Sequence, residues 1–175
     1  GSNIGQFRTL YKYSLTGAGS PLITTSTSSI NFGNVIIGQT GNQVLTINNV
    51  GTGPLIISSF TMTNPRFSIA PNNVPDTIQA GLSKNYTASF TPTVFDTTSG
   101  ELRIVSNDLG NPIKVVQLRG KGVYSGAYFG VTSNSFNYNN RRINSLCGYS
   151  FTVTNQGTQP LIINSVNFAS QRFRF

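Results

Sequence analysis

The chain has 175 residues, of which 37% are hydrophobic and 9% charged, and it carries a net charge of +8 with a pI of about 10.1. It has no histidine and one cysteine, Cys147, which excludes the imidazole base of hydrolytic triads, histidine metal sites, intrachain disulfides and multi-cysteine zinc sites. Asn, Ser and Thr contribute 20 residues each, and because their side chains compete with the helical backbone for hydrogen bonds, the composition favours β-structure.

From residue 20 onward, short runs of alternating apolar and polar residues are separated by turns rich in Gly, Pro, Asn and Asp. In one such run Tyr86, Ala88 and Phe90 alternate with polar side chains, so one face is buried and the other is in water. We expect strands at 29–32, 34–38, 43–49, 54–61, 66–70, 83–91, 100–106 and 113–119. This spacing predicts an all-β fold with antiparallel sheets packed as a β-sandwich.

The alternation also predicts which side chains form the core between the two sheets. They are Ile30, Phe32, Leu45, Ile47, Leu55, Ile57, Phe67, Tyr86, Phe90, Leu102, Ile104, Val116 and Leu118.

The sequence repeats itself. Residues 46–57 read TINNVGTGPLII and residues 152–163 read TVTNQGTQPLII, and this spacing of 106 holds without a gap from 29–69 to 135–175. A second similar pair of segments is LTGAG at 15–19 and LRGKG at 118–122. We therefore expect tandem modules: residues 1–19 as the terminal strand of a preceding module, 20–122 as a complete module, and 123–175 as the first half of another.

The ordered motifs carry a family likeness. SINFGNVIIGQT (29–40), VLTINNVGTGPLII (44–57), YTASFTP (86–92), GELRIVSND (100–108) and VVQLRGKG (115–122) together resemble the Ig-like repeats of the ASH or Hydin group, and most of all bacterial choice-of-anchor D modules. The resemblance implies an Ig-like sandwich related to major sperm protein domains. It also implies a scaffold or interaction role, on bacterial surfaces or in cilia and centrosomes, without shared catalytic residues.

The second copy departs from the first, and we expect its early strand to be altered or more exposed. Val35 to Gly38 are replaced by Arg141, Arg142, Ile143 and Asn144, and aromatic residues are dense around the second junction. The candidate interaction residues are Tyr124, Tyr128, Phe129, Arg141 and Arg142. The aromatic side chains could stack on sugars, although packing between adjacent modules is the more ordinary use of such a cluster.

The sequence offers little for catalysis. The four acids are Asp76, Asp96, Glu101 and Asp108, and they lie mostly at turns, where a carboxylate commonly caps its own backbone. Cys147 aligns with Gly41 at the start of a strand, which favours a bystander thiol over a reactive one. We expect no enzymatic activity, no cofactor and no metal site.

These observations favour a structural or interaction module of a secreted or cell-surface protein, with a ciliary or cytoskeletal location as the alternative. A glycan- or peptide-binding adhesin module that uses the junction aromatics is the second hypothesis. We expect protein partners, or self-association through exposed strand edges, in which residues 7–19 or another copy pair with 123–175.

Two other kinds of partner are not expected. The basic residues are scattered, with no run longer than two, so the sequence shows no dense stripe for nucleic acid. No uninterrupted apolar run exceeds three residues, which excludes insertion into a bilayer.

Overall fold

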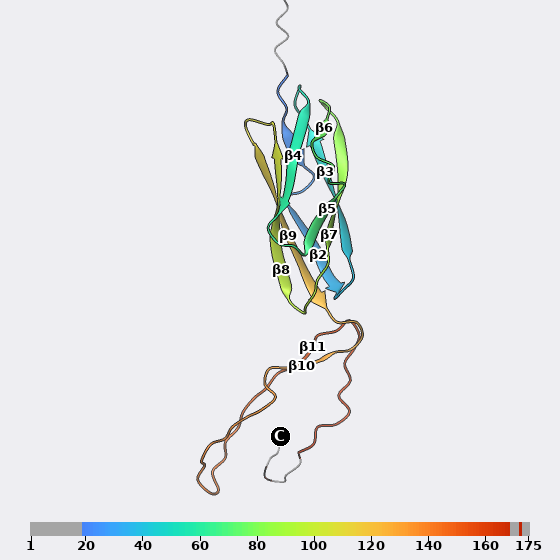
Figure 1. Ribbon diagram of the computed structural model, residues 1–175. Helices are drawn as coiled ribbons and strands as arrows, with labels where there is room; N and C mark the ends of the chain where they lie inside the picture. The colour runs from blue at the N-terminus through green and yellow to red at the C-terminus, as the bar shows by residue number, and fades with distance from the viewer. Residues whose placement is uncertain (1–18, 169–171, 173–175) are drawn as a thin grey trace, which may run out of the picture.

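The computed structural model describes residues 19–168 and Arg172, and every regular element in that part of the chain is a strand (Figure 1). The strands are β1 (Ile23–Thr25), β2 (Ser29–Ile36), β3 (Gly41–Asn49), β4 (Leu55–Met62), β5 (Phe67–Ala70), β6 (Asp76–Ile78), β7 (Ser83–Phe90), β8 (Thr97–Ser106), β9 (Ile113–Val123), β10 (Phe129–Val131) and β11 (Val153–Asn155). The predicted all-β fold is confirmed. In the described residues there is no apolar helix of a length that would span a bilayer.

The strands β1 to β9 form a sandwich of two sheets (Figure 1). One sheet has four strands in the order β1-β3-β7-β5, and the other has five in the order β2-β9-β8-β4-β6. The predicted strands within 29–119 are present, with 29–32 and 34–38 joined as β2. The short strands β1 and β6 were not predicted, because three residues hardly show an alternation.

The core lies between the two sheets and consists of the predicted side chains. All of the predicted core residues are buried, and Ile23, Val35, Ile69, Ile78 and Ala88 complete the cluster. At one end the rings of Phe32, Phe67 and Phe90 pack together, with centroids 4.9 to 5.8 Å apart. The burial pattern confirms the predicted register of the strands.

One part of the sheet prediction is wrong: the sandwich is not entirely antiparallel. Strand β2 pairs with β9 in parallel, while β8 pairs with β9 antiparallel on the other side. Parallel pairing becomes available because the chain crosses from β1 in one sheet to β2 at the edge of the other. The pairing of β2 shifts between Asn31 and Asn34, where Gly33 has φ +66° and its N–H donates to Asn31 Oδ1 at 2.9 Å.

Asn49 is a buried polar side chain that joins three segments at one end of the sandwich. Its Oδ1 accepts from the N–H groups of Leu22 and Gly51 at 3.2 and 3.1 Å. Its Nδ2 donates to the carbonyl oxygens of Gly53 and Ile78 at 2.7 and 2.9 Å. The amide side chain therefore makes four hydrogen bonds, the number that an asparagine buried away from water needs.

Gly51, two residues after Asn49, is required because two chain segments approach each other closely there. A Cβ at Gly51 would lie 2.2 Å from the carbonyl oxygen of Ser20. No side chain fits there unless the backbone moves, which explains why the turn reads Asn-Val-Gly.

Three of these four contacts recur 106 residues further along the chain. Asn155 Oδ1 accepts from the N–H groups of Tyr128 and Gly157 at 3.3 and 3.0 Å, and its Nδ2 donates to the carbonyl oxygen of Gln159 at 2.6 Å. Strand β10 pairs with β11 with Phe129 opposite Asn155, just as β1 pairs with β3 with Ile23 opposite Asn49. The sequence similarity thus corresponds to the same local structure at this point.

Beyond these contacts the second copy forms little regular structure. Strands β10 and β11 are the elements that the structure gives for residues 124–168. Residues 7–18, which we expected to supply a pairing strand, lie outside the described residues, as do Phe173 and Phe175. The division at 1–19, 20–122 and 123–175 remains a prediction.

The four acids all take part in contacts that hold the sandwich together. Asp76 pairs with Lys84 at 2.7 Å, Asp96 with Arg66 at 2.7 Å, and Glu101 with Arg103 at 3.0 Å. Buried Asp108 accepts from the N–H of Ile23 at 3.0 Å and thereby fixes the start of β1. The carboxylates therefore serve the fold.

These contacts shift the pKa values of three carboxyls. Burial raises the pKa of Asp76, but hydrogen bonds from Lys84 and Tyr86, together with the charge of Lys84, outweigh burial and lower it. The hydrogen bond from Arg66 lowers the pKa of Asp96, with a further contribution from Thr98. Hydrogen bonds from Arg103 and Gln117 lower the pKa of Glu101.

Phe90 tests the aromatic core. Phe90→Ala is expected to reduce the free energy of unfolding by about 3–5 kcal/mol, because it removes a fully buried ring and leaves a cavity. Urea denaturation measures the change. Leu109→Ala, at a position that is 95% exposed, serves as control and should change stability by less than about 0.5 kcal/mol. Equal losses in the two variants would contradict the assignment of the core.

Asn48, the neighbour of Asn49, provides a matched control for substitution of Asn49. Asn49→Ala should cost more than about 2 kcal/mol, because buried backbone groups lose their partners. Asn48 is half-buried and donates one hydrogen bond of 3.4 Å to Thr24, so Asn48→Ala should cost less than about 1 kcal/mol. Urea denaturation of both variants measures the loss in the free energy of unfolding. Equal losses in the two variants would contradict the role given to Asn49.

The lowered carboxyl pKa values predict loss of stability in acid. Each of these carboxylates stabilises the fold fully above its ordinary pKa, near 4, and the contribution disappears as pH falls through the lowered value in the folded state. We expect the free energy of unfolding to be nearly constant from pH 5 to 8, since the chain has no histidine, and to fall between pH 4 and 2. Asp76→Asn should show a smaller fall, and an equal fall would refute the role of Asp76.

Candidate functional site

The structure divides the predicted interaction residues into two groups. Tyr124 and Tyr128 come together where the sandwich meets β10 and β11, with Phe129 as the first residue of β10. Arg141 and Arg142 lie in the long segment between β10 and β11. Tyr124 and Tyr128 stack on each other, whereas Arg141 lines a cavity in the later segment.

Three aromatic rings form a stack at the junction. The ring of Tyr124 lies 3.7 Å from that of Tyr128, at an interplanar angle of 13°, and 5.8 Å from that of Phe95, at 9°. Lys121 Nζ lies 4.8 Å from the centre of the Phe95 ring, at a distance suited to a cation–π contact. We call Phe95, Tyr124 and Tyr128 the junction stack.

Sequence reasoning missed Phe95 and Lys121. Phe95 lies in the loop between β7 and β8, and Lys121 lies on the outer face of β9. Neither position shows a pattern that links it to Tyr124, because the contacts depend on where the loop folds over the end of the sheet. Phe95 could have been suspected only as an aromatic residue in a polar loop.

The backbone also ties the two parts of the chain together. The N–H of Tyr124 donates to the carbonyl oxygen of Gln156 at 3.1 Å, and Tyr124 forms a parallel bridge with Gly157. The carbonyl oxygen of Gly126 accepts from Thr158 at 2.7 Å and from Gln159 at 3.0 Å. Strand β9 thus continues directly into the unit formed by β10 and β11, which lies beyond the end of the sandwich (Figure 1).

The stack is partly withdrawn from water. Burial raises the pKa of the Tyr124 hydroxyl, and the neighbouring Tyr128 raises it further. Tyr128 and Phe129 remain 44% and 54% exposed. The junction therefore has one side suited to holding the chain together and another that still presents aromatic surface to solvent.

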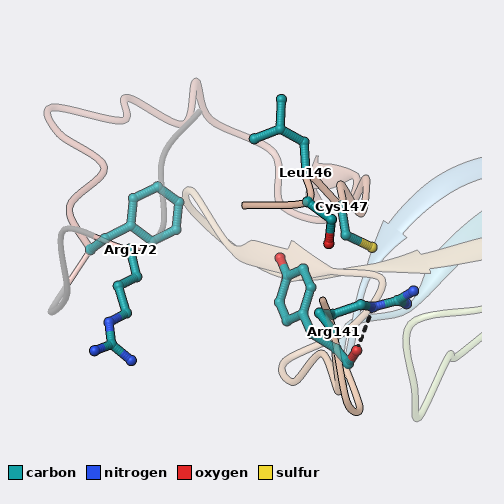
Figure 2. A pocket seen from close by; sticks show the side chains of 7 residues that line it. Arg141, Leu146, Cys147 and Arg172 are labelled. Atoms are coloured by element: carbon teal, nitrogen blue, oxygen red, sulfur yellow. Dashed lines mark hydrogen bonds between the residues drawn. The ribbon is translucent and has the colours of Figure 1, made fainter. Parts of the chain in front are cut away.

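Arg141 lines a cavity of about 210 Å³ in the segment that follows β10 (Figure 2). Its other lining residues are Tyr138, Ser145, Leu146, Cys147, Phe168 and Arg172. Arg141 Nε donates to the carbonyl oxygen of Tyr138 at 2.6 Å, which Figure 2 shows as a dashed line. Arg142 does not line this cavity, and its carbonyl oxygen accepts from the Ser145 hydroxyl at 2.8 Å.

Cys147 is exposed, and within the described residues no group of three or more His, Cys, Asp or Glu side chains could hold a metal ion.

Comparison with solved structures finds the same fold elsewhere. A protein of unknown function from Porphyromonas gingivalis is 24% identical, with a TM-score of 0.53 over 62% of this chain and 50% of that chain. The ASH/PapD-like domain 7 of human CEP192 is 15% identical, with a TM-score of 0.51 over 58% of this chain and 85% of that one. The Vibrio cholerae VesB protease is 13% identical, with a TM-score of 0.48 over 57% of this chain and 31% of that one.

At these identities the Porphyromonas and CEP192 structures show the fold alone, and this chain spans only half the length of the Porphyromonas protein. No curated protein matches the sequence. The sequence does match the HYDIN/CFA65/VesB-like, Ig-like domain over residues 21–121. Because the match extends over more than half of the chain, this protein belongs to the family of HYDIN/CFA65/VesB-like Ig-like domains.

Proposed function

We propose that this chain is a non-catalytic structural and interaction region of a tandem-repeat protein, in which each Ig-like module spaces or displays its neighbours. The observation that carries the proposal is the recurrence of three of the four Asn49 hydrogen bonds at Asn155, with the same strand register beside them. A second start of the same fold, placed directly after the first sandwich, is what a tandem array requires.

The junction supports a spacer role. A spacer transmits distance only when the connection between modules is stiff, and a flexible linker would let the modules rotate independently. Here the connection is short, hydrogen-bonded through Tyr124 and Gly126, and covered by the junction stack. Each of these contacts opposes bending between β9 and the unit that follows.

We expect no catalysis, because the four carboxyl groups are engaged in contacts within the protein. The acids Asp76, Asp96 and Glu101 are held in ion pairs, and Asp108 holds backbone N–H groups. A general acid or base needs a carboxyl that faces a bound substrate. Each of these four carboxyls is already bound by a donor of the protein itself.

We place the protein at a cell surface or outside the cell, as a module of the choice-of-anchor D kind, with a ciliary or cytoskeletal location as the alternative. The composition supports an exposed environment, since the chain has one Cys, one Met and no Trp that could be oxidised. Protein partners or further copies of the module are the expected neighbours.

A second function has one observation in its favour. Tyr128 and Phe129 are about half exposed beside the junction stack, and exposed aromatic rings can stack on sugar rings or peptide side chains. A glycan- or peptide-binding adhesin module is therefore the alternative to a pure spacer.

The stiffness of the junction can be measured by ¹⁵N relaxation. In the unchanged protein the amides of β9 and β11 should report the same rotational correlation time. Tyr124→Ala removes the middle ring of the stack and should give the β11 amides a shorter correlation time. Tyr149→Ala removes a tyrosine that packs on Phe136 and Tyr138, and should leave the correlation time of the β11 amides equal to that of β9.

Independent tumbling of β9 and β11 in the unchanged protein would overturn the spacer proposal. A glycan array addresses the alternative function. Binding that is retained in Tyr149→Ala and lost in Tyr128→Ala would favour the adhesin module, because only the second substitution removes the exposed ring of the stack.

A further inference from the structure

The outer face of the five-stranded sheet has two adjoining hollows above β9. One, of about 300 Å³, is lined by Asn31, Gly33, Asn34, Thr97, Arg119, Gly120 and Lys121. The other, of about 350 Å³, is lined by Ser29, Ile30, Asn31, Ser99, Gln117, Leu118 and Arg119. The two adjoin at Asn31 and Arg119, which line both, and we call them together the β9 groove.

The strand register arranges polar side chains across this groove in rows. Arg119 on β9 lies between Asn31 of β2 and Ser99 of β8. Lys121 lies between Asn34 and Thr97 in the next row. Alternate residues of a strand point to the same face, about 7 Å apart, so Arg119 and Lys121 present two charges along the floor.

Neither cation is neutralised. The ion pairs among the described residues join Arg66, Lys84 and Arg103 to acids, and none includes Arg119 or Lys121. Lys121 Nζ lies 4.8 Å from the centre of the Phe95 ring, which places an aromatic residue of the junction stack at that end of the groove.

The other end of the groove is bounded by Glu101. This carboxylate is occupied by Arg103 at 3.0 Å and by Gln117 at 3.3 Å, so it does not reach toward Arg119. The groove therefore has one positive segment, between its neutral amides and hydroxyls.

From this arrangement we propose that the β9 groove binds an acidic polysaccharide, with Arg119 and Lys121 holding carboxylate or sulfate groups. Guanidinium and ammonium groups form strong, charge-assisted hydrogen bonds to such anions. Asn31, Asn34, Thr97 and Ser99 have amides and hydroxyls that both donate and accept, which matches the hydroxyl groups of sugar rings.

Other polyanions fit the groove less well. An acidic peptide that adds to a sheet pairs its backbone with the free edge of a strand, whereas the groove lies on the side-chain face between β2 and β8. Nucleic acid binding depends on many cations along the phosphate backbone, and the groove supplies two. A polymer with spaced acids and many hydroxyls suits two cations within a neutral polar surface.

The test uses polygalacturonate as the probe and its fully methyl-esterified form as the neutral comparison. Titration calorimetry and ¹⁵N–¹H spectra of the whole chain should show binding of the acid form, with shifts concentrated in residues 29–34 and 117–121. Arg119→Gln and Lys121→Gln should each weaken binding about tenfold, because each removes a charged hydrogen-bond donor. The methyl ester should bind at least tenfold more weakly than the acid form.

Lys114→Gln is the matched control. Lys114 lies on the same strand, carries the same charge and lines neither hollow, so its loss should change binding less than twofold. The proposal is overturned if polygalacturonate does not bind, if Lys114→Gln weakens binding as much as Lys121→Gln, or if the methyl ester binds equally well. Equal or tighter binding of polyglutamate or duplex DNA would also overturn it, because the groove would then recognise charge and not sugar.

Discussion

The architecture depends on the hydrogen bonding of a single strand, β9. It pairs with β8 on one side and with β2 on the other, and its end leads through Tyr124 to Gly157. A strand held on both sides cannot shift its register without turning every side chain to the opposite face. The position of the core, of the outer groove and of the junction therefore follows from how this strand is paired.

The motif LRGKG at 118–122 shows what this constraint demands of the sequence. The inner face of the strand carries Leu118, Gly120 and Gly122, which are buried. The outer face carries Arg119 and Lys121. A Cβ at Gly120 would lie 2.5 Å from the ring of Phe90, and one at Gly122 would lie 2.2 Å from the carbonyl oxygen of Val94. The inner positions are small because the core and a loop press against the strand there, while the outer positions are free to carry charge.

The sequence predicted most of the sandwich, because strand alternation reports burial directly. Leu45, Ile47, Tyr86 and Phe90 lie at positions that the alternation alone assigns to the core, and all are buried. The strands β1 and β6 escaped prediction because three residues are too few for a pattern. The parallel pairing of β2 escaped because it depends on the crossing of the chain between sheets, which no local signal records.

The candidate site was predictable only in part, because some of its contacts depend on tertiary arrangement and leave no local pattern in the sequence. The density of aromatic residues after β9 pointed to Tyr124 and Tyr128, which do stack. Their partner Phe95 comes from a loop distant in sequence, and the β9 groove arises from three strands side by side. Contacts of this kind follow from the tertiary arrangement, so they become visible once the strands are placed.

Strand β9 continues, hydrogen-bonded, into the unit that follows it. Amide hydrogen exchange at Tyr124 tests this most directly, because its N–H donates to the carbonyl oxygen of Gln156 at 3.1 Å. This amide and the amides in the middle of β9 are expected to exchange far more slowly than those of an unstructured peptide. Exchange of the Tyr124 amide at the rate of an unstructured chain, with β9 still protected, would show that the sandwich ends at Val123 and would contradict the account.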